Sequence, residues 1–251
     1  MPGRSPAIDR CVDALARSRS VVVSTGAGIS KESGIPTFRD APNALWANFD
    51  PETLATPEGF RQNPSLVWRW YGERRSMISN ASPNKGHEAL AEMESMFEEF
   101  MLVTQNIDNL HRQAGSVNLI EIHGNIFKHK CFDVGHPIDE LPDDDREPPR
   151  CECGSMIRPD IVWFGEMLPE EEFDRAIRAL QTCDTALIVG TSGTVHPAAG
   201  FASVAKEAGA TLIEVNPEET PITEIADIFV QSTSAKALEQ IVQSLKETRR
   251  K

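Results

Sequence analysis

The sequence predicts an α/β protein in which a Rossmann-like parallel sheet carries helices on both faces and a smaller domain is inserted. Short apolar runs rich in β-branched residues alternate with amphipathic segments, a pattern typical of buried parallel strands separated by helices. The expected strands are residues 21–24, 100–104, 119–123, 186–189, 211–215 and 228–230. Two stretches interrupt the alternation, residues 41–82 and 128–156, and these predict the inserted domain.

The N-terminal residues predict an amphipathic helix, because Ile8, Cys11, Val12 and Leu15 recur at helical spacing. This segment lacks the apolar centre of a signal peptide, and no apolar run in the chain approaches the ~20 residues that a bilayer requires. We therefore expect no membrane contact and a cytoplasmic location. A mitochondrial or nuclear location is the alternative, since no clear targeting segment is present.

Residues 21–34 run from the first strand into a glycine-rich turn, after which a helix could open. Gly26 and Gly28 let the backbone approach a ligand closely, and free N–H groups at such a turn favour a phosphate. The alternative is a tight turn of the kind found in any α/β protein. Lys31 stands where the common dinucleotide fingerprint has its third glycine, which disfavours an ordinary hydride-transferring dehydrogenase.

The chain of 251 residues is long enough for one large core with a smaller unit attached. Residues 1–40, 83–127 and 157–251 are expected to form the sheet domain. The small domain would combine a helical insertion, residues 41–82, with a cysteine-containing lobe, residues 128–156. The first of these has no clear strand and holds three of the four tryptophans, and the second is rich in acids and prolines.

The net charge of −13 argues against nucleic acid as a ligand, because binding to a phosphate backbone needs a basic face. It suits a basic partner, with plain solubility as the simpler explanation. Five cysteines, an odd number, do not suggest a disulfide framework.

Polar segments follow the expected strands, and the carboxyl ends of parallel strands meet at one edge of a sheet. His123 comes at a strand end and is followed by glycine. A histidine there can act as a general base, the alternative being a core histidine satisfied by its neighbours.

Seven motifs in order resemble the sirtuins: GAGIS (26–30), ESGIPTFR (32–39), TQNIDNLH (104–111), IHGN (122–125), RPDIVWFGE (158–166), GTS (190–192) and VNPEE (215–219). The resemblance covers about residues 16–245. It implies an enzyme that uses NAD to remove acyl groups from protein lysine, giving nicotinamide and O-acyl-ADP-ribose. A plain deacetylase, a non-catalytic module that binds NAD or ADP-ribose, and an ADP-ribosyl transferase are the alternatives.

The resemblance also implies roles for particular residues. His123 would be the general base, and Asn106 and Asp108 would order the ribose and the carboxamide. The expected NAD-binding residues are Gly26, Ala27, Gly28, Ile29, Ser30, Pro36, Thr37, Phe38, Arg39, Gln105, Asn106, Ile107, Asp108, Gly190, Thr191, Ser192, Asn216, Pro217, Glu218 and Ser234. The partner would be an acyl-lysine protein or peptide, bound as an added strand by Val162, Phe164, Gly165 and Glu166, and we expect a monomer.

Tyr71 and Arg74 stand three residues apart and therefore share one helix face. The pair looks like the tyrosine and arginine of the class III sirtuins, which implies a preference for succinyl, malonyl or glutaryl groups. In the alternative, Tyr71 is a packing residue and Arg74 is solvated.

The cysteine lobe departs from the two C-x-x-C pairs that most sirtuins use to bind zinc. Val134 occupies the second position of the first pair, and the second pair is the shorter Cys151-Glu152-Cys153. Cys131, Cys151 and Cys153 remain as ligands, whereas a closed structural zinc site needs four. Asp133, His136 or His129 could complete the set, or the lobe folds without metal.

Overall fold

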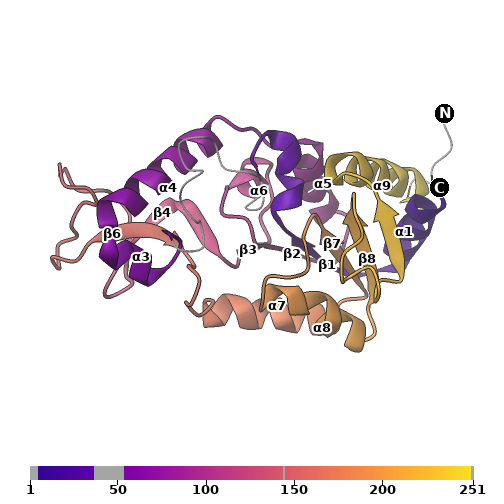
Figure 1. Ribbon diagram of the computed structural model, residues 1–251. Helices are drawn as coiled ribbons and strands as arrows, with labels where there is room; N and C mark the ends of the chain where they lie inside the picture. Colours follow the sequence, from indigo (N-terminus) through magenta and orange to yellow (C-terminus); the bar gives the residue numbers. More distant parts are fainter. Residues whose placement is uncertain (1–4, 37–53, 144, 250–251) are drawn as a thin grey trace.

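The computed structural model describes residues 5–36, 54–143 and 145–249 (Figure 1). Its larger sheet has six parallel strands in the order β3-β2-β1-β7-β8-β9. Their bounds are Ser20–Thr25 (β1), Glu99–Thr104 (β2), Leu119–Glu121 (β3), Thr185–Val189 (β7), Thr211–Asn216 (β8) and Ile228–Gln231 (β9). The predicted parallel sheet is confirmed, with all six strands within a few residues of their expected positions. His123 lies two residues beyond β3 rather than inside it.

Helices cover both faces of this sheet (Figure 1). One face is packed by α1 (Pro6–Arg17), α5 (Lys85–Glu94) and α9 (Ser234–Arg249), and the other by α7 (Glu170–Thr182) and α8 (Phe201–Glu207). Because strand side chains alternate, Val21 and Val23 enter the first core and Val22 enters the second. Two buried faces explain why β1 reads as a continuous apolar run.

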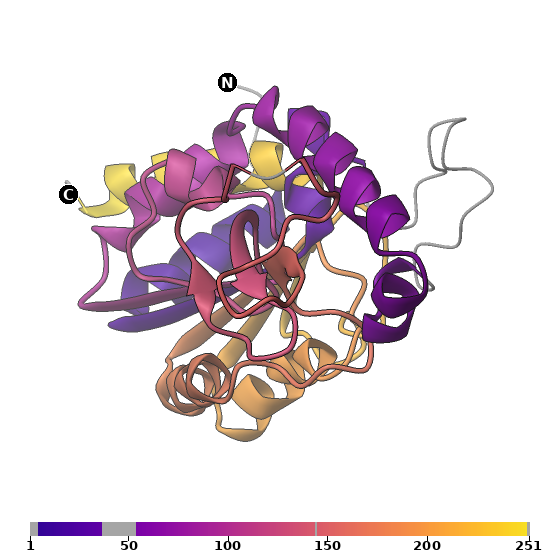
Figure 2. The same cartoon turned by 90° about the vertical axis from the view of Figure 1, so that its left-hand side faces the viewer.

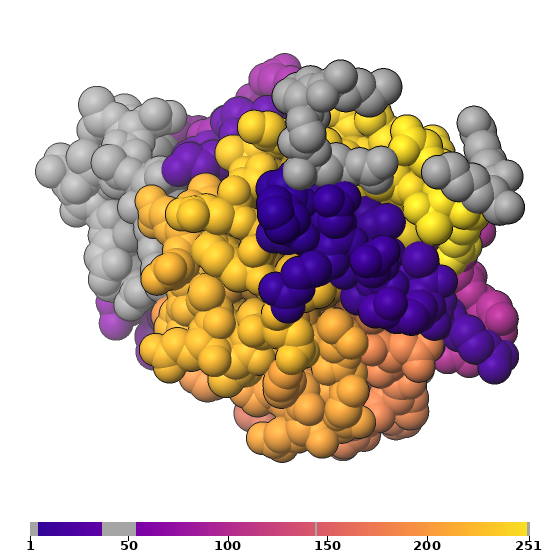
Figure 3. All heavy atoms as spheres, turned by 90° about the vertical axis from the view of Figure 1, so that its right-hand side faces the viewer, coloured from indigo at the N-terminus to yellow at the C-terminus, as the bar shows by residue number. Residues whose placement is uncertain are grey.

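At one end of the molecule, α1 in indigo lies against α9 in yellow (Figure 3). Ser5 caps the start of α1 by accepting a hydrogen bond from the backbone N–H of Ile8, and Pro6 opens the helix. The helices in the described part of the chain include none with both the length and the apolar character of a membrane span.

A second unit stands beside the carboxyl ends of the large sheet. It contains α3 (Pro57–Gln62), α4 (Pro64–Ser79) and an antiparallel sheet of order β5-β4-β6, with β4 at Gly124–Cys131, β5 at Pro137–Ile138 and β6 at Ile157–Ile161. Figure 2 views this unit end-on, with α3 and α4 in purple along one side. The division of the chain at residues 127 and 157 stays a prediction. The strands that pair in this sheet begin at Gly124 and end at Ile161.

The glycine-rich turn after β1 does not open into an α-helix. Two short 3₁₀ turns follow instead, η1 (Ala27–Ile29) and η2 (Lys31–Ser33). A third 3₁₀ turn, η3 (Ala198–Gly200), precedes α8, and the four-residue helix α6 (Leu110–Gln113) follows β2. Ile29 of η1 is fully buried in the first core, so the turn is fixed to the sheet domain by this side chain.

The turn after β1 meets the turn after β7 at a close backbone contact between Gly28 and Gly190. The N–H of Gly28 donates to the carbonyl of Gly190 at 2.8 Å. A Cβ atom on Gly28 would lie 2.6 Å from that carbonyl oxygen, and Gly190 itself has φ of +60°. Neither position has room for a side chain.

We expect Gly28→Ala to lower the free energy of unfolding by about 1–3 kcal/mol, because the new methyl group must push the two turns apart. Gly34→Ala is the matched control, since Gly34 has φ of +84° and a Cβ atom there would meet nothing within 4 Å. That change should cost about 1–2 kcal/mol of backbone strain and leave the contact of Gly28 with Gly190 intact. Urea unfolding with and without NAD measures both effects. Only Gly28→Ala should also reduce the stabilisation by NAD, the ligand that the family resemblance implies for this turn, and equal reductions would contradict this account.

Candidate active site

Four central strands of the sheet end at the same level at their carboxyl ends. Thr25 of β1 is paired with Thr104 of β2 and with Val189 of β7, and Val189 is paired with Val215 of β8. The loops that follow these strands therefore share one edge of the sheet, as predicted. Between this edge and the second unit lies a cleft of about 730 Å³, the size of a small-molecule site.

Most of the residues expected to bind NAD or substrate line this cleft. They are Gly26, Ala27, Gly28, Ser30, Pro36, Tyr71, Arg74, Gln105, Asn106, Ile107, Asp108, His123, Val162, Phe164, Gly165, Glu166, Gly190, Thr191, Ser192, Asn216, Pro217, Glu218 and Ser234. Ile29 is outside the lining and packs in the core. Thr37, Phe38 and Arg39 lie outside the described residues.

Polar side chains hold the floor of the cleft beside the glycine-rich turn. The Asn106 Nδ2 donates to the carbonyl of Gly26 and to the Ser30 Oγ, both at 3.1 Å. The Ser30 hydroxyl donates to the Asp108 Oδ2 at 2.6 Å, and the backbone N–H of Leu110 donates to the Oδ1 at 3.0 Å. Burial raises the pKa of Asp108, whereas these two hydrogen bonds favour the carboxylate.

His123 is held in one orientation by the main chain. Its Nδ1 lies 2.9 Å from the carbonyl oxygen of Gln105. A carbonyl can only accept, so Nδ1 carries the proton and Nε2 is left as the basic nitrogen. Burial lowers the pKa of His123, against the opposing effect of the Gln105 carbonyl. The ring is therefore neutral near pH 7, which is the state that a general base requires.

Two more histidines, His87 of α5 and His111 of α6, lie behind Ser30 with ring centres 4.8 Å apart. The His87 Nε2 is 3.4 Å from the Ser30 Oγ, and burial lowers its pKa to about 4. Burial, with a smaller effect from His87, lowers the pKa of His111 to about 3. Neither histidine received a role from the sequence, although His111 closes the motif at 104–111 and His87 stands at the third position after the helix cap Asn84.

Glu32 connects the glycine-rich turn to the C-terminal helix. Its carboxylate accepts hydrogen bonds from the Thr233 Oγ1 at 3.0 Å and from the backbone N–H of Ala235 at 2.9 Å. The amino end of α9 is thereby occupied by a side chain of this protein. At the same end of the cleft, the Asn216 Nδ2 donates to the carbonyl of Thr191 at 2.8 Å.

The helix α4 supplies the opposite wall. Tyr71 and Arg74 both line the cleft from one face of α4, and the Arg74 guanidinium lies 5.1 Å from the ring centre of Trp70. Sequence reasoning missed Ile78, which the same spacing extended by four residues would have found. It also missed Trp163, which lies between two residues expected to bind substrate.

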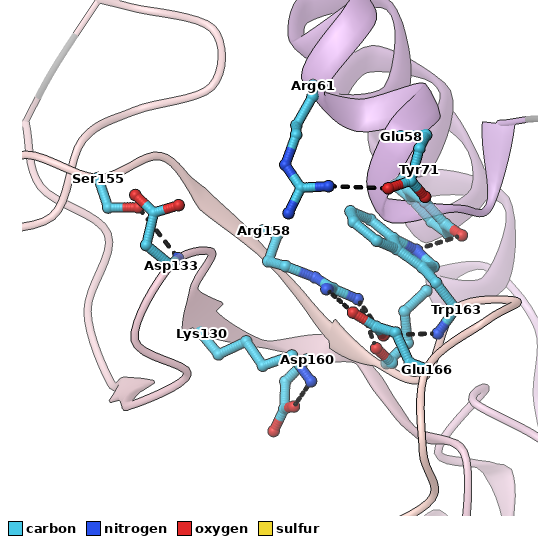
Figure 4. A network of polar contacts seen from close by, with 11 residues as sticks. Glu58, Arg61, Tyr71, Lys130, Asp133, Ser155, Arg158, Asp160, Trp163 and Glu166 are labelled. Carbon is cyan, nitrogen blue, oxygen red and sulfur yellow. Dashed lines mark hydrogen bonds and ion pairs between the residues drawn. The ribbon is translucent and has the colours of Figure 1, made fainter.

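The segment after β6 is held by a buried ion pair (Figure 4). The Arg158 side chain is 2% exposed and binds both carboxylate oxygens of Glu166. Glu166 also accepts a hydrogen bond from the backbone N–H of Trp163 at 2.8 Å. Burial alone would raise the pKa of Glu166, and the bonds from Arg158 and Trp163 overcome this and lower it. Its carboxylate is thus engaged inside the protein.

Four side chains of types that ligate metals gather in the cysteine lobe. The ligand atoms of Cys131, His136, Cys151 and Cys153 all lie within 4.8 Å of one another. Three sulfurs and one imidazole nitrogen are a donor set that suits tetrahedral zinc, so the residues fit this metal. His129 points elsewhere, since its Nε2 is 2.9 Å from Arg75.

Known proteins resemble this chain over most of its length. Residues 26–197 match the model of the Sir2 family. A protein of Aquifex aeolicus named NAD-dependent protein deacylase is 50% identical over 236 residues, which cover 91% of this chain and 96% of the relative.

Two solved structures have the same fold. A Sir2 homologue in complex with NAD superposes with a TM-score of 0.89 at 40% identity, covering 96% of this chain and 94% of that one. A Sir2 protein bound to an acetylated peptide gives a TM-score of 0.83 at 30% identity, covering 94% and 98%. The protein whose cleft is described above belongs to the Sir2 family, the sirtuins.

Proposed function

We propose that the protein is an NAD-dependent protein-lysine deacylase that prefers acidic acyl groups. One observation carries the proposal: a single cleft brings together the glycine-rich turn, a neutral His123 with a basic Nε2, and a tyrosine–arginine pair. The relatives named as deacylases, and the Sir2 structure with an acetylated peptide, support the general reaction.

The cleft suits NAD in size and in chemistry. The glycine-rich turn allows close backbone approach, and Gln105, Asn106 and Asn216 offer amide groups for hydroxyls and a carboxamide. As co-substrate, NAD supplies the ribose carbon that accepts the acyl oxygen while nicotinamide leaves. Asp108 and the Asn106 amide would favour positive charge at that carbon because they act in a water-poor site. His123 would take a ribose hydroxyl proton at Nε2.

The acyl preference rests on Tyr71 and Arg74. Burial lowers the pKa of the Arg74 guanidinium, so an anion beside it would be stabilised by a charge that is already partly desolvated. A guanidinium and a phenol one helical turn apart offer charge-assisted hydrogen bonds to a carboxylate. An acetyl group would leave both donors without such an acceptor.

We also infer that the lobe binds zinc through Cys131, His136, Cys151 and Cys153. The role would be structural, because four protein ligands leave no open position for substrate. The cluster lies between β4 and the segment leading to β6, so the metal would hold together the sheet that carries the peptide-binding segment.

His123→Ala should lower kcat/KM by about 10²- to 10⁴-fold, because the ribose hydroxyl loses its base. NAD binding measured by calorimetry should persist. In the wild type, the base works when neutral and its pKa lies below the usual 6.5. The acid limb of the kcat/KM profile should therefore fall below pH 6.5. An unchanged rate in His123→Ala would contradict the assignment.

The wild type should turn over a succinyl-lysine peptide faster than its acetyl-lysine counterpart, with kcat/KM measured by nicotinamide release. Arg74→Met should reduce that ratio by about 10- to 100-fold, as expected for the loss of charge-assisted hydrogen bonds. Arg75→Met is the matched control, because Arg75 turns toward Trp68 and His129. Equal ratios in the wild type and Arg74→Met would indicate a plain deacetylase. No turnover of either peptide would favour a binding module.

Purified protein should contain about one equivalent of zinc, the number that one closed four-ligand site holds. His136→Ala should lose most of it and lower the melting temperature, because metal binding contributes directly to folding of such a lobe. His129→Ala should retain the metal. Zinc content by mass spectrometry and thermal unfolding provide the two readouts. A full equivalent of zinc in His136→Ala would show that a different fourth ligand is used.

A further inference from the structure

The hydroxyl of Tyr71 receives a hydrogen bond from within the protein. The Trp163 indole Nε1 donates to the Tyr71 Oη at 2.9 Å, across 92 residues of sequence (Figure 4). An indole N–H can only donate, so the tyrosine oxygen is the acceptor in this bond. The Arg74 guanidinium can likewise only donate. Neither Trp163 nor Arg74 can accept the phenolic proton of Tyr71, which is therefore directed to some other group.

Trp163 is itself fixed on several sides. The Arg158 guanidinium lies 3.3 Å from its ring centre, and the Phe60 ring packs against it at 5.2 Å. Its backbone N–H is held by Glu166, which Arg158 also binds. The side chain of Trp163 is 2% exposed. These contacts fix the orientation of the indole ring, so its N–H points toward Tyr71.

We propose that Trp163 is a positioning residue for acyl selectivity, whose N–H makes Tyr71 a dedicated hydrogen-bond donor to an acceptor on the acyl group. The inference rests on the acyl preference proposed above. A succinyl carboxylate accepts this proton, whereas the methyl group of an acetyl substrate does not. Without the indole N–H, the phenol can rotate or donate elsewhere, and the orientation of its proton is lost.

The kinetic test is a double-mutant cycle of Trp163→Phe and Tyr71→Phe, with succinyl and acetyl versions of one peptide. Trp163→Phe should lower the succinyl-to-acetyl ratio of kcat/KM by about tenfold, mainly by raising KM for the succinyl peptide. The double variant should show no lower ratio than Tyr71→Phe alone, because both changes remove one interaction. Trp68→Phe, which alters a tryptophan packed on Arg75, is the control.

Some kinetic outcomes would overturn the inference. These are an unchanged ratio in Trp163→Phe, an equal loss for both peptides, or effects of the two changes that multiply in the double variant. If Trp163→Phe does not fold, benzothienylalanine at position 163 replaces the N–H by sulfur and retains the ring shape.

A spectroscopic test separates this inference from the proposed acyl preference. Tyr71 is the only tyrosine in the chain, so ultraviolet resonance Raman spectra report its hydroxyl alone. In the free wild type, the intensity ratio of the tyrosine Fermi doublet should indicate that the Tyr71 hydroxyl accepts a hydrogen bond. This indication should be lost in Trp163→Phe. Adding the succinyl peptide should shift the intensity ratio of the wild-type doublet toward the value of a tyrosine hydroxyl that donates a hydrogen bond. A doublet indifferent to Trp163→Phe would refute the inference. A wild type with the expected doublet and no succinyl preference would refute the acyl proposal and with it the selectivity role of Trp163, leaving only the hydrogen bond from Trp163 to Tyr71.

Discussion

The close approach of Gly28 to Gly190 is the contact on which the sheet side of the cleft depends. A backbone hydrogen bond joins the turns after two neighbouring strands, and neither of its glycines has room for a side chain. Asn106 then reaches the carbonyl of Gly26 and the hydroxyl of Ser30, and Ser30 reaches Asp108. The turn after β1 is therefore held by backbone on the side of β7 and by polar side chains on the side of β2.

The opposite wall of the cleft is built on side chains rather than backbone. Arg158 and Glu166 form a buried ion pair that also holds Trp163 through its ring and its N–H. Breaking such a buried pair is costly because it leaves an uncompensated charge. The Glu166 carboxylate gains a further hydrogen bond from the Trp163 N–H, whereas the buried Arg158 Nε has no hydrogen-bond partner among the described residues. The ion pair also fixes the orientation of the segment after β6, which faces α4. The cleft thus has one wall of backbone contacts and one wall of interlocked side chains.

The sequence predicted the parts of the protein that depend on local patterns. Strands such as 21–24 can be predicted because β-branched residues buried on both faces leave an uninterrupted apolar run. The shared helix face of Tyr71 and Arg74 followed from their spacing, and their role followed from the family resemblance. Contacts between segments far apart in the chain could not be predicted from the sequence. Trp163 meets Tyr71 only because β6 and α4 pack together. His136 joins the cysteines because a hairpin returns its carbonyl to the N–H of Cys131 at 2.9 Å.

Glu32 has a consequence for the order in which the protein acquires its site. Its carboxylate binds Thr233, which is 201 residues later in the chain. The hydrogen bond of Gly28 likewise cannot form until Gly190 has been synthesised. During synthesis at about 5–20 residues per second, the glycine-rich turn leaves the ribosome long before either partner exists. The nascent chain therefore cannot join the glycine-rich turn to the amino end of α9 until synthesis is almost complete. A chain cut short before residue 233 would lack both partners of Glu32, and the glycine-rich turn would have no contact with α9 through this carboxylate.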